Sequence, residues 1–167
     1  MRMPLLLIAS LTILLAETVA GLTWTPPAGW ISKGATQMRA ATYVVAENAE
    51  CVVYFFGVGQ GGPVQANLDR WKSQFATPDG KPAPAKIAKT TIHGLPVTTI
   101  AAAGQYTGMG GPMAKTQSTA ADFRLLGAIV EGPGGNVFLK FTGPTRLVTQ
   151  NESKFKQLLD SFARSAK

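Results

Sequence analysis

The chain has 167 residues and a formal net charge of +7, but only 15% of its residues are charged, against roughly 25% in an average domain. Its only cysteine, Cys51, excludes an internal disulfide, and one cysteine with one histidine excludes a standard zinc site. The lysines and arginines are scattered instead of clustered in a stripe, which argues against nucleic-acid binding.

The first twenty residues have the organisation of a secretory signal peptide. A short positive start precedes an apolar run over residues 5–15, and residues 18–20 (Thr-Val-Ala) are the small or β-branched residues that a signal peptidase reads. The run is too short for a membrane span, which needs about 20 apolar residues. We therefore expect cleavage near Ala20, export to the periplasm or the exterior, and a single domain over residues 21–167 that does not span a membrane.

Two tryptophans, Trp24 and Trp30, lie on either side of a Pro-Pro pair just after this leader. They could form an aromatic binding edge. We favour the alternative, in which their rings anchor the N-terminal segment onto the core, because large aromatic side chains contribute most when they are buried.

Most of the remaining chain is predicted to form strands. Residues 38–46 and 50–57 are rich in β-branched and aromatic residues and flank a hairpin loop. Both alternating sets of the second strand are apolar, which indicates a central strand covered on both faces. Residues 86–93 and 95–106 form another pair around Gly94, and residues 76–84 form a loop rich in proline.

The last predicted pair of strands covers residues 122–131 and 136–142, which flank a turn of glycine and proline at residues 132–135. In the second of these strands one face carries only large apolar residues: Val137, Leu139 and Phe141. The other face mixes polar and apolar residues: Phe138, Lys140 and Thr142.

Two segments have helical periodicity. The first follows Pro63, which suits the first position of a helix, and carries one apolar stripe: Val64, Leu68, Trp71 and Phe75. The second lies near the C-terminus and repeats the pattern: Phe155, Leu158, Leu159 and Phe162. Thr149 and Glu152 have the spacing of a capping box ahead of it, and Asn151 lies in a glycosylation-like triplet but is expected to cap the helix.

Hairpin-connected strands with only two helices predict an α+β fold, in which an antiparallel sheet carries helices packed on its faces. The predicted core combines residues from the strands and both helices: Cys51, Val53, Phe55, Leu68, Trp71, Phe123, Leu125, Phe141, Phe155 and Phe162.

Short motifs through most of the predicted domain resemble those of one known family. They are residues 24–30 (WTPPAGW), 54–57 (YFFG), 66–71 (ANLDRW), 94–97 (GLPV), 140–144 (KFTGP) and 158–162 (LLDSF). The chain is similar in these motifs to the PsbP/Mog1-like α/β/α sandwich family, in which many exported bacterial members have no assigned role. The resemblance implies that sandwich fold and a binding or assembly role without catalysis, since plant-lumen members are extrinsic photosystem subunits and nuclear members bind a small GTPase.

A glycine-rich segment over residues 57–62 matches G-x-G-x-x-G between a predicted strand and a predicted helix. Gly59, Gln60, Gly61 and Gly62 therefore form a candidate anion-binding turn. A dinucleotide site is disfavoured, because the strands that follow form hairpins and Asp79 lies in a proline-glycine loop instead of at a strand end. We expect a strand-to-helix connection here and predict no cofactor.

The stretch over residues 104–120 is rich in glycine, methionine and threonine and predicts a long functional loop. Its candidate interaction residues are Tyr106, Met109, Met113 and Lys115. Met109 and Met113, with His93, could instead bind Cu(I), which prefers thioethers. Loop methionines more often cover a sheet edge, so we predict no metal.

Nothing in the sequence predicts catalysis. His93 lies beside Gly94 at a turn and is expected to be exposed, no G-x-S-x-G motif is present, and the carboxylates are far apart. The preferred hypothesis is an exported, non-catalytic interaction or assembly module that binds a protein or another envelope component through its loops. The alternatives are a small-ligand or metal-binding protein and, less favoured, a hydrolase.

Overall fold

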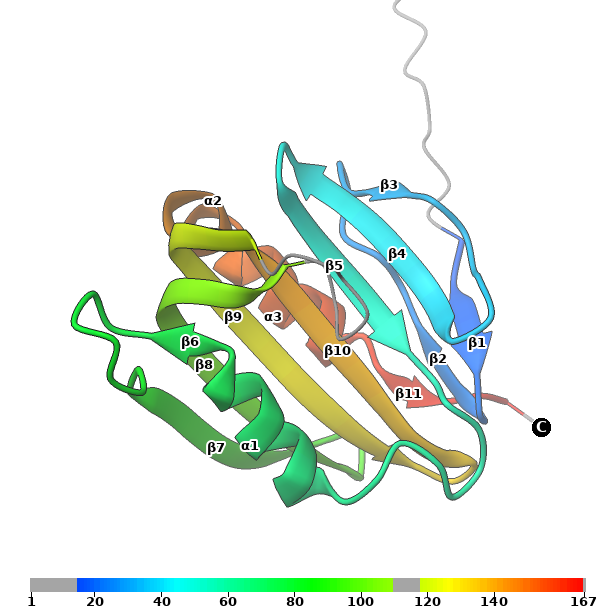
Figure 1. Ribbon diagram of the computed structural model, residues 1–167. Coiled ribbons are helices and arrows are strands. Elements are labelled where there is room, and N and C mark those ends of the chain that lie inside the picture. The colour runs from blue at the N-terminus through cyan, green and yellow to red at the C-terminus, as the bar shows by residue number, and fades with distance from the viewer. Residues whose placement is uncertain (1–14, 110–117, 167) are drawn as a thin grey trace, which may run out of the picture.

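The computed structural model describes residues 15–109 and 118–166. For residues 108, 109 and 118–120 it describes the backbone only. Its main sheet has eight strands, all antiparallel, in the order β3-β4-β5-β10-β9-β8-β6, with β7 paired to β8 (Figure 1). The strands are β3 (Ile31–Ser32), β4 (Arg39–Ala46), β5 (Ala49–Tyr54), β6 (Phe75–Ala76), β7 (Ala85–Ile92), β8 (Leu95–Met109), β9 (Ser118–Gly132) and β10 (Gly135–Pro144). The α+β prediction is confirmed.

A small second sheet lies beside the main one and joins the two ends of the described chain. It pairs β1 (Glu17–Val19) with β2 (Leu22–Trp24), and β2 with β11 (Ala163–Arg164). Ala20 and Gly21, with φ of 53° and 73°, form the tight turn between β1 and β2. The Gly134 N–H donates to the Ala20 carbonyl at 3.0 Å, so this turn is attached to the β9–β10 turn.

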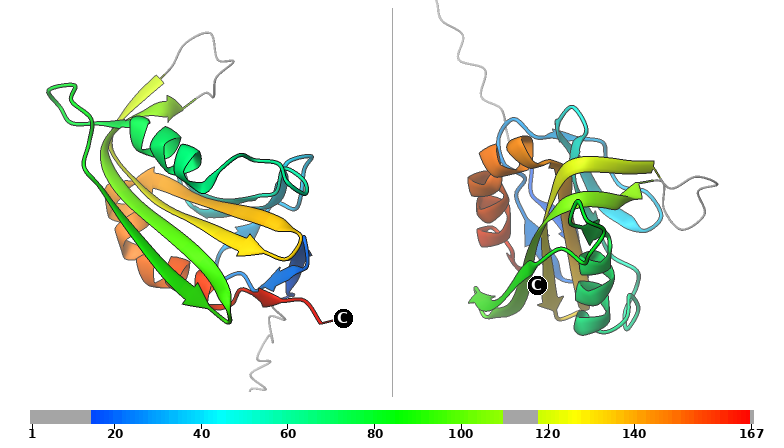
Figure 2. Two further views of the ribbon diagram at one scale, coloured as in Figure 1. Left: turned by 90° about the horizontal axis from the view of Figure 1, so that it is seen from below. Right: turned by 60° about the vertical axis from the view of Figure 1, so that its left-hand side comes forward.

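Helices cover the two faces of the main sheet unequally. Helices α2 (Thr145–Gln150) and α3 (Glu152–Asp160) lie on one face, and α1 (Val64–Ser73) lies on the other (Figure 2). The alternation along β10 decides which residues meet which helices, because successive side chains of a strand point to opposite faces. Val137, Leu139 and Phe141 join the core cluster under α2 and α3, whereas Phe138 joins the cluster under α1.

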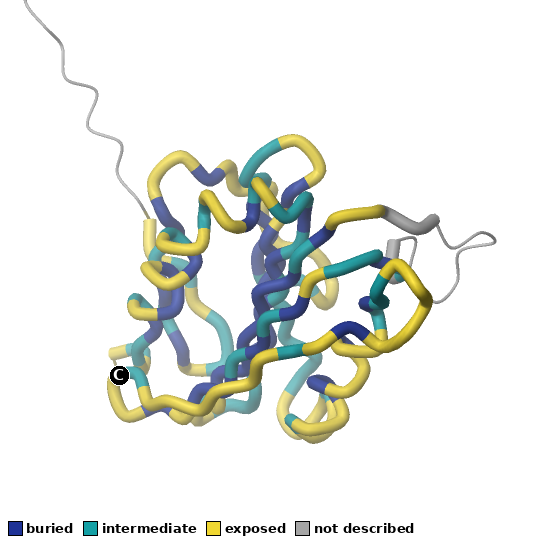
Figure 3. Tube along the Cα trace, turned by 90° about the vertical axis from the view of Figure 1, so that its left-hand side faces the viewer, coloured by how far each residue is buried: buried dark blue, intermediate teal, exposed yellow. Residues whose placement is uncertain are grey.

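The buried residues run along the central strands, and β7 and the loops are exposed (Figure 3). Nine of the ten predicted core residues are buried, and the tenth, Phe55, is half-buried against the cluster under α2 and α3. Phe55 follows the end of β5, two residues before the glycine-rich turn, which explains its partial exposure. Trp24 and Trp30 are buried, so the anchoring interpretation of these rings is confirmed.

The first predicted helix is shorter than its apolar stripe. Helix α1 ends at Ser73, and Phe75 belongs to β6, where it pairs with Tyr106. Pro63 is the extended residue before the helix instead of its first helical residue. The spacing of Phe75 fits the stripe by coincidence, since this ring reaches the same core from a strand.

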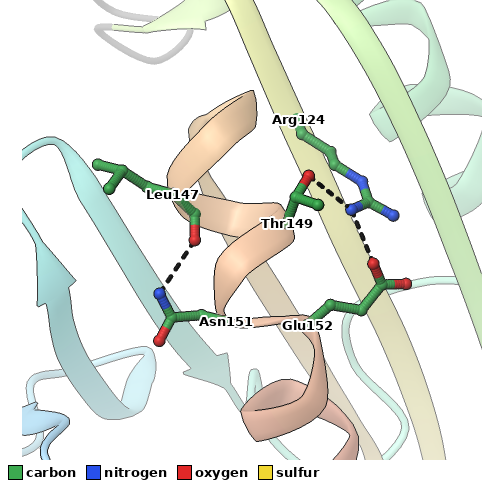
Figure 4. A network of polar contacts seen from close by, with 5 residues as sticks. All are labelled: Arg124, Leu147, Thr149, Asn151 and Glu152. Carbon is green, nitrogen blue, oxygen red and sulfur yellow. Dashed lines mark hydrogen bonds and ion pairs between the residues drawn. The ribbon is translucent and has the colours of Figure 1, made fainter.

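The capping-box prediction at the C-terminal helix was wrong. The segment forms two helices that meet at Asn151, and neither has a side-chain cap hydrogen bond at its start. Arg124 from β9 instead binds both the Thr149 hydroxyl, at 3.0 Å, and the Glu152 carboxylate, at 2.8 Å (Figure 4). The Asn151 amide donates back to the Leu147 carbonyl, so Asn151 stabilises the end of α2 instead of capping α3.

The prediction of one long loop over residues 104–120 was also wrong at both ends. Strand β8 continues to Met109 and β9 begins at Ser118, with two irregular positions in their pairing. Gly104 has a φ of 151°, and a side chain there would overlap the Ala76 carbonyl. The glycines that suggested a loop therefore include one that allows close packing within a strand.

Candidate functional site

A pocket opens on the α1 face of the main sheet, beside the end of α1, with a volume of about 700 Å³. Strands β4, β5 and β10 form its floor, and Gln74, the residue after α1, lies at its rim. The side chains that give it chemical character are Arg39, Glu50, Tyr54, Tyr106, Phe123 and Lys140. Its size is within the usual range of small-ligand sites, about 300–1,000 Å³.

Lys140 is the central polar group of the pocket. Its Nζ donates to Gln74 Oε1 at 2.6 Å and to the Tyr106 hydroxyl at 3.1 Å. Burial and, to a lesser extent, the positive charge of Arg70 together lower the pKa of Lys140 to about 8. The side chain is therefore mainly an ammonium ion at neutral pH, held in a partly dry site.

Tyr106 and Phe123 form one wall and belong to a stack of three aromatic rings that Phe75 completes from behind. Phe75 and Tyr106 have ring centroids 4.9 Å apart, and Tyr106 and Phe123 are 5.8 Å apart and nearly parallel. Burial raises the pKa of Tyr106 to about 12, so its hydroxyl keeps its proton. This hydroxyl can therefore donate a hydrogen bond to a ligand while it accepts one from Lys140.

The opposite wall carries an ion pair. Arg39 and Glu50 are 3.6 Å apart, and the Arg39 guanidinium also lies 5.7 Å from the centre of the Tyr54 ring. Both charged side chains are well exposed, so the pair adds little to stability. It does place one positive and one negative charge at the mouth of the pocket.

One of the four predicted interaction residues lines this pocket. Tyr106 lies within strand β8 and is 6% exposed, although the sequence placed it in the predicted loop over residues 104–120. The backbone of Met109 ends β8, while Met113 and Lys115 lie outside the described residues. His93 is at the β7–β8 turn, so nearly the whole of β8 separates it from Met109, and these two residues cannot share a metal.

The glycine-rich turn has its own structural explanation. Gly59, Gly61 and Gly62 all have positive φ, and a Cβ at position 61 would lie 2.7 Å from the Phe138 ring. The Asn67 amide donates to the Gly61 carbonyl at 2.8 Å and holds the turn against α1. The anion site over Gly59, Gln60, Gly61 and Gly62 stays a prediction, and these residues do not line the Lys140 pocket.

The described part of the chain offers neither a cluster of metal-ligating side chains nor a membrane-spanning helix. No three His, Cys, Asp or Glu side chains come together there as a possible metal site, and no described helix is long and apolar enough to cross a membrane. His93 is exposed at its turn, as predicted, with Nδ1 2.9 Å from the Phe162 carbonyl oxygen. Burial raises the pKa of Cys51, so it remains an inert thiol.

Sequence reasoning placed Lys140 and Thr142 on the correct strand face but did not identify the pocket. The available signal was an isolated lysine in an otherwise apolar strand, a position that is costly unless the charge has a use. Gln74 and Tyr54 gave no signal, because the packing of distant elements brings Gln74 to Lys140 and Tyr54 into the lining of the same pocket.

Comparison with known proteins bears on the fold. No protein-family model and no curated protein matches the chain. The solution structure of cyanobacterial PsbP (CyanoP) from Synechocystis sp. PCC 6803 matches with a TM-score of 0.57 and 12% identity, over 97% of this chain and 98% of that one. The chain has a PsbP-like fold.

The crystal structure of a protein of unknown function, PA94 from Pseudomonas aeruginosa, matches with a TM-score of 0.48 and 12% identity, over 92% of this chain and 99% of that one. The PsbP-like fold is an antiparallel sheet with helices on both faces, in agreement with the sequence resemblance. A likeness at 12% identity concerns the fold, and function has to be argued from the site.

Proposed function

We propose that the protein is an exported, non-catalytic interaction module that binds a protein or another envelope component, with the Lys140 pocket as its contact site. The observation that carries the proposal is a half-buried ammonium group in an aromatic-lined cavity on the less covered face of the sheet. The leader-like N-terminus supports export, and the sequence resemblance supports a binding role.

The polar groups of the pocket favour binding over catalysis. Lys140 is held by two neutral acceptors, and Glu50 is paired with Arg39, so no described base in the pocket faces a nucleophile. Such an arrangement fixes the orientation of a ligand by charge and hydrogen bonds.

Crosslinking in cells, followed by affinity capture and mass spectrometry, tests the proposal. Val44 lines the pocket from the same face of the sheet as Glu50, and Val44→Trp would fill it, whereas Thr90→Trp adds the same ring on the exposed strand β7 and serves as the matched control. We expect one recurrent partner that is captured with the wild type and with Thr90→Trp but is lost with Val44→Trp. A partner captured equally with all three proteins would refute the pocket as the contact site.

A further inference from the structure

We propose that the Lys140 pocket recognises a small monocarboxylate, meaning one carboxylate group carried on an apolar or aromatic body. The inference rests on the proposed function, because it names the chemistry of the same site. Three features of the pocket carry it: two adjacent hydrogen-bond donors, one uncompensated positive charge and a set of apolar walls.

The two donors are the Lys140 ammonium and the Tyr106 hydroxyl. The ammonium has three N–H bonds and uses two on described acceptors, which leaves one for a ligand. The Tyr106 hydroxyl accepts from Lys140, so its own proton is free to be donated. The donor atoms are 3.1 Å apart, a separation that lets one planar carboxylate accept from both.

The charge balance of the pocket favours a single negative charge. Arg39 pairs with Glu50, whereas the ion pairs among the described residues include no acidic partner for Lys140, and Arg70 acts on Lys140 from outside the lining of the pocket. A half-buried charge with only neutral partners is costly, and one carboxylate would compensate it. For the second charge of a dianion such as a phosphate ester, the lining offers only Arg39, which is already paired with Glu50.

The remaining surface of the pocket is suited to an apolar body. Val44, Ala46 and Val52 line it from β4 and β5, and Phe123 lines it from β9. A volume of about 700 Å³ is far larger than one carboxylate and leaves room for a ring or a short alkyl chain. The polar groups therefore orient the ligand, and the aliphatic and aromatic walls hold the rest of it.

Titration of the isotope-labelled full chain, followed by NMR, tests this inference with phenylacetate as the probe. Phenylacetamide has the same shape without the charge, and phenyl phosphate carries the second charge. We expect saturable shifts of the Val52, Tyr106 and Thr142 amide signals with phenylacetate. The amide and the phosphate ester are expected to bind at least tenfold more weakly.

Two variants separate the donors, and a third is the control. Lys140→Met keeps most of the apolar stem but removes the ammonium, and it should weaken phenylacetate binding at least tenfold. Tyr106→Phe removes one hydroxyl from an otherwise unchanged ring and should weaken binding several-fold, which keeps the test valid if Lys140→Met does not fold. Lys156→Met changes an exposed lysine on α3 and should leave the affinity unchanged.

Equal binding of phenylacetate and phenylacetamide, or unchanged phenylacetate binding by both Lys140→Met and Tyr106→Phe, would overturn the inference. Tighter binding of phenyl phosphate would overturn the preference for one charge. If these tests fail while Val44→Trp still abolishes partner capture, only the carboxylate inference is lost. If capture is also insensitive to Val44→Trp, the proposed function fails as well.

Discussion

The two faces of the main sheet are built from the same strands but are closed in different ways. Under α2 and α3 the core is apolar and aromatic, with Trp24 stacked on Phe162 and Trp30 tilted against Phe141. On the other face α1 covers only part of the sheet, and Lys140 and its partners line the pocket beside it. A single strand, β10, supplies Phe141 to one face and Lys140 to the other, so alternate residues of this strand serve the apolar core and the pocket.

The largest effect on stability is expected on the face of the sheet that α2 and α3 cover. Phe162 is fully buried and stacks on Trp24 with ring centroids 5.1 Å apart. Phe162→Ala should lower the free energy of unfolding by about 3–5 kcal/mol, because it removes a ring and leaves a cavity. Urea unfolding measures this loss. A loss below about 1 kcal/mol would show that this face is not the main source of stability.

On the α1 face, which carries the Lys140 pocket, the main effect on stability should depend on pH. The pKa of Lys140 is about 8 in the folded chain against an ordinary value of 10.5. The unfolded chain therefore binds more protons between these values, and the free energy of unfolding should rise with pH across this window by about 2–3 kcal/mol. Lys140→Met should remove the rise, which urea unfolding between pH 7 and pH 10 would detect.

The groups that face Lys140 could mask this rise, and the variant is compared with the wild type at each pH for that reason. They are Arg70 from α1, Tyr106 from β8, Tyr54 and Glu50 from β5, and Arg39 from β4. The pKa values of Tyr54 and Tyr106 are raised by burial, so these groups reduce stability at still higher pH. If the free energy of unfolding of wild type and Lys140→Met changed in parallel with pH, Lys140 would not be the source of the rise.

A substitution with a smaller effect on stability tests how closely α1 packs on its face of the sheet. A Cβ at Gly127 would lie 2.8 Å from both Ile100 Cγ2 and the Trp71 ring. Gly127→Ala should therefore cost about 1–3 kcal/mol by overpacking. Thermal unfolding measures it, with Thr90→Ala on exposed β7 as the control. A neutral result would mean that α1 can move away from the sheet without loss.

The smallest effect is expected at a surface lysine. Lys156 pairs with Asp160 one turn along α3, and both side chains are exposed. Lys156→Met should change the free energy of unfolding by less than about 0.5 kcal/mol at any pH between 7 and 10. If Lys156→Met changed the pH dependence of the free energy of unfolding as much as Lys140→Met, the environment of Lys140 would not be the cause of its effect.

Local pattern was sufficient to predict most of the fold. The period-two alternation in residues 136–142 placed Phe141 and Lys140 on opposite faces, and the apolar stripe of Leu68 and Trp71 predicted α1. The pattern failed at Phe75, because a strand and a helix can present a ring to the same core. It failed at Thr149 and Glu152 because Arg124, 25 residues earlier than Thr149, competes for both side chains.

The pocket could not be predicted in the same way, since it depends on long-range register. Lys140 lies opposite Val52 on β5 and Gly127 on β9, while Tyr106 meets Phe75 through the pairing of β8 with β6. Gln74 reaches Lys140 across 66 positions of sequence. Strand propensity indicates none of these pairings, because each depends on how distant strands align.

The hairpin between β1 and β2 sets an order of events for any processing at its turn. A peptidase binds its substrate as an extended chain, whereas Ala20 lies in a tight turn with its carbonyl bonded to Gly134. Cutting after Ala20 would therefore have to precede folding, and it would remove β1 from the finished domain. A chain that folds first would keep residues 1–20, so the order of folding and cutting would decide which form accumulates.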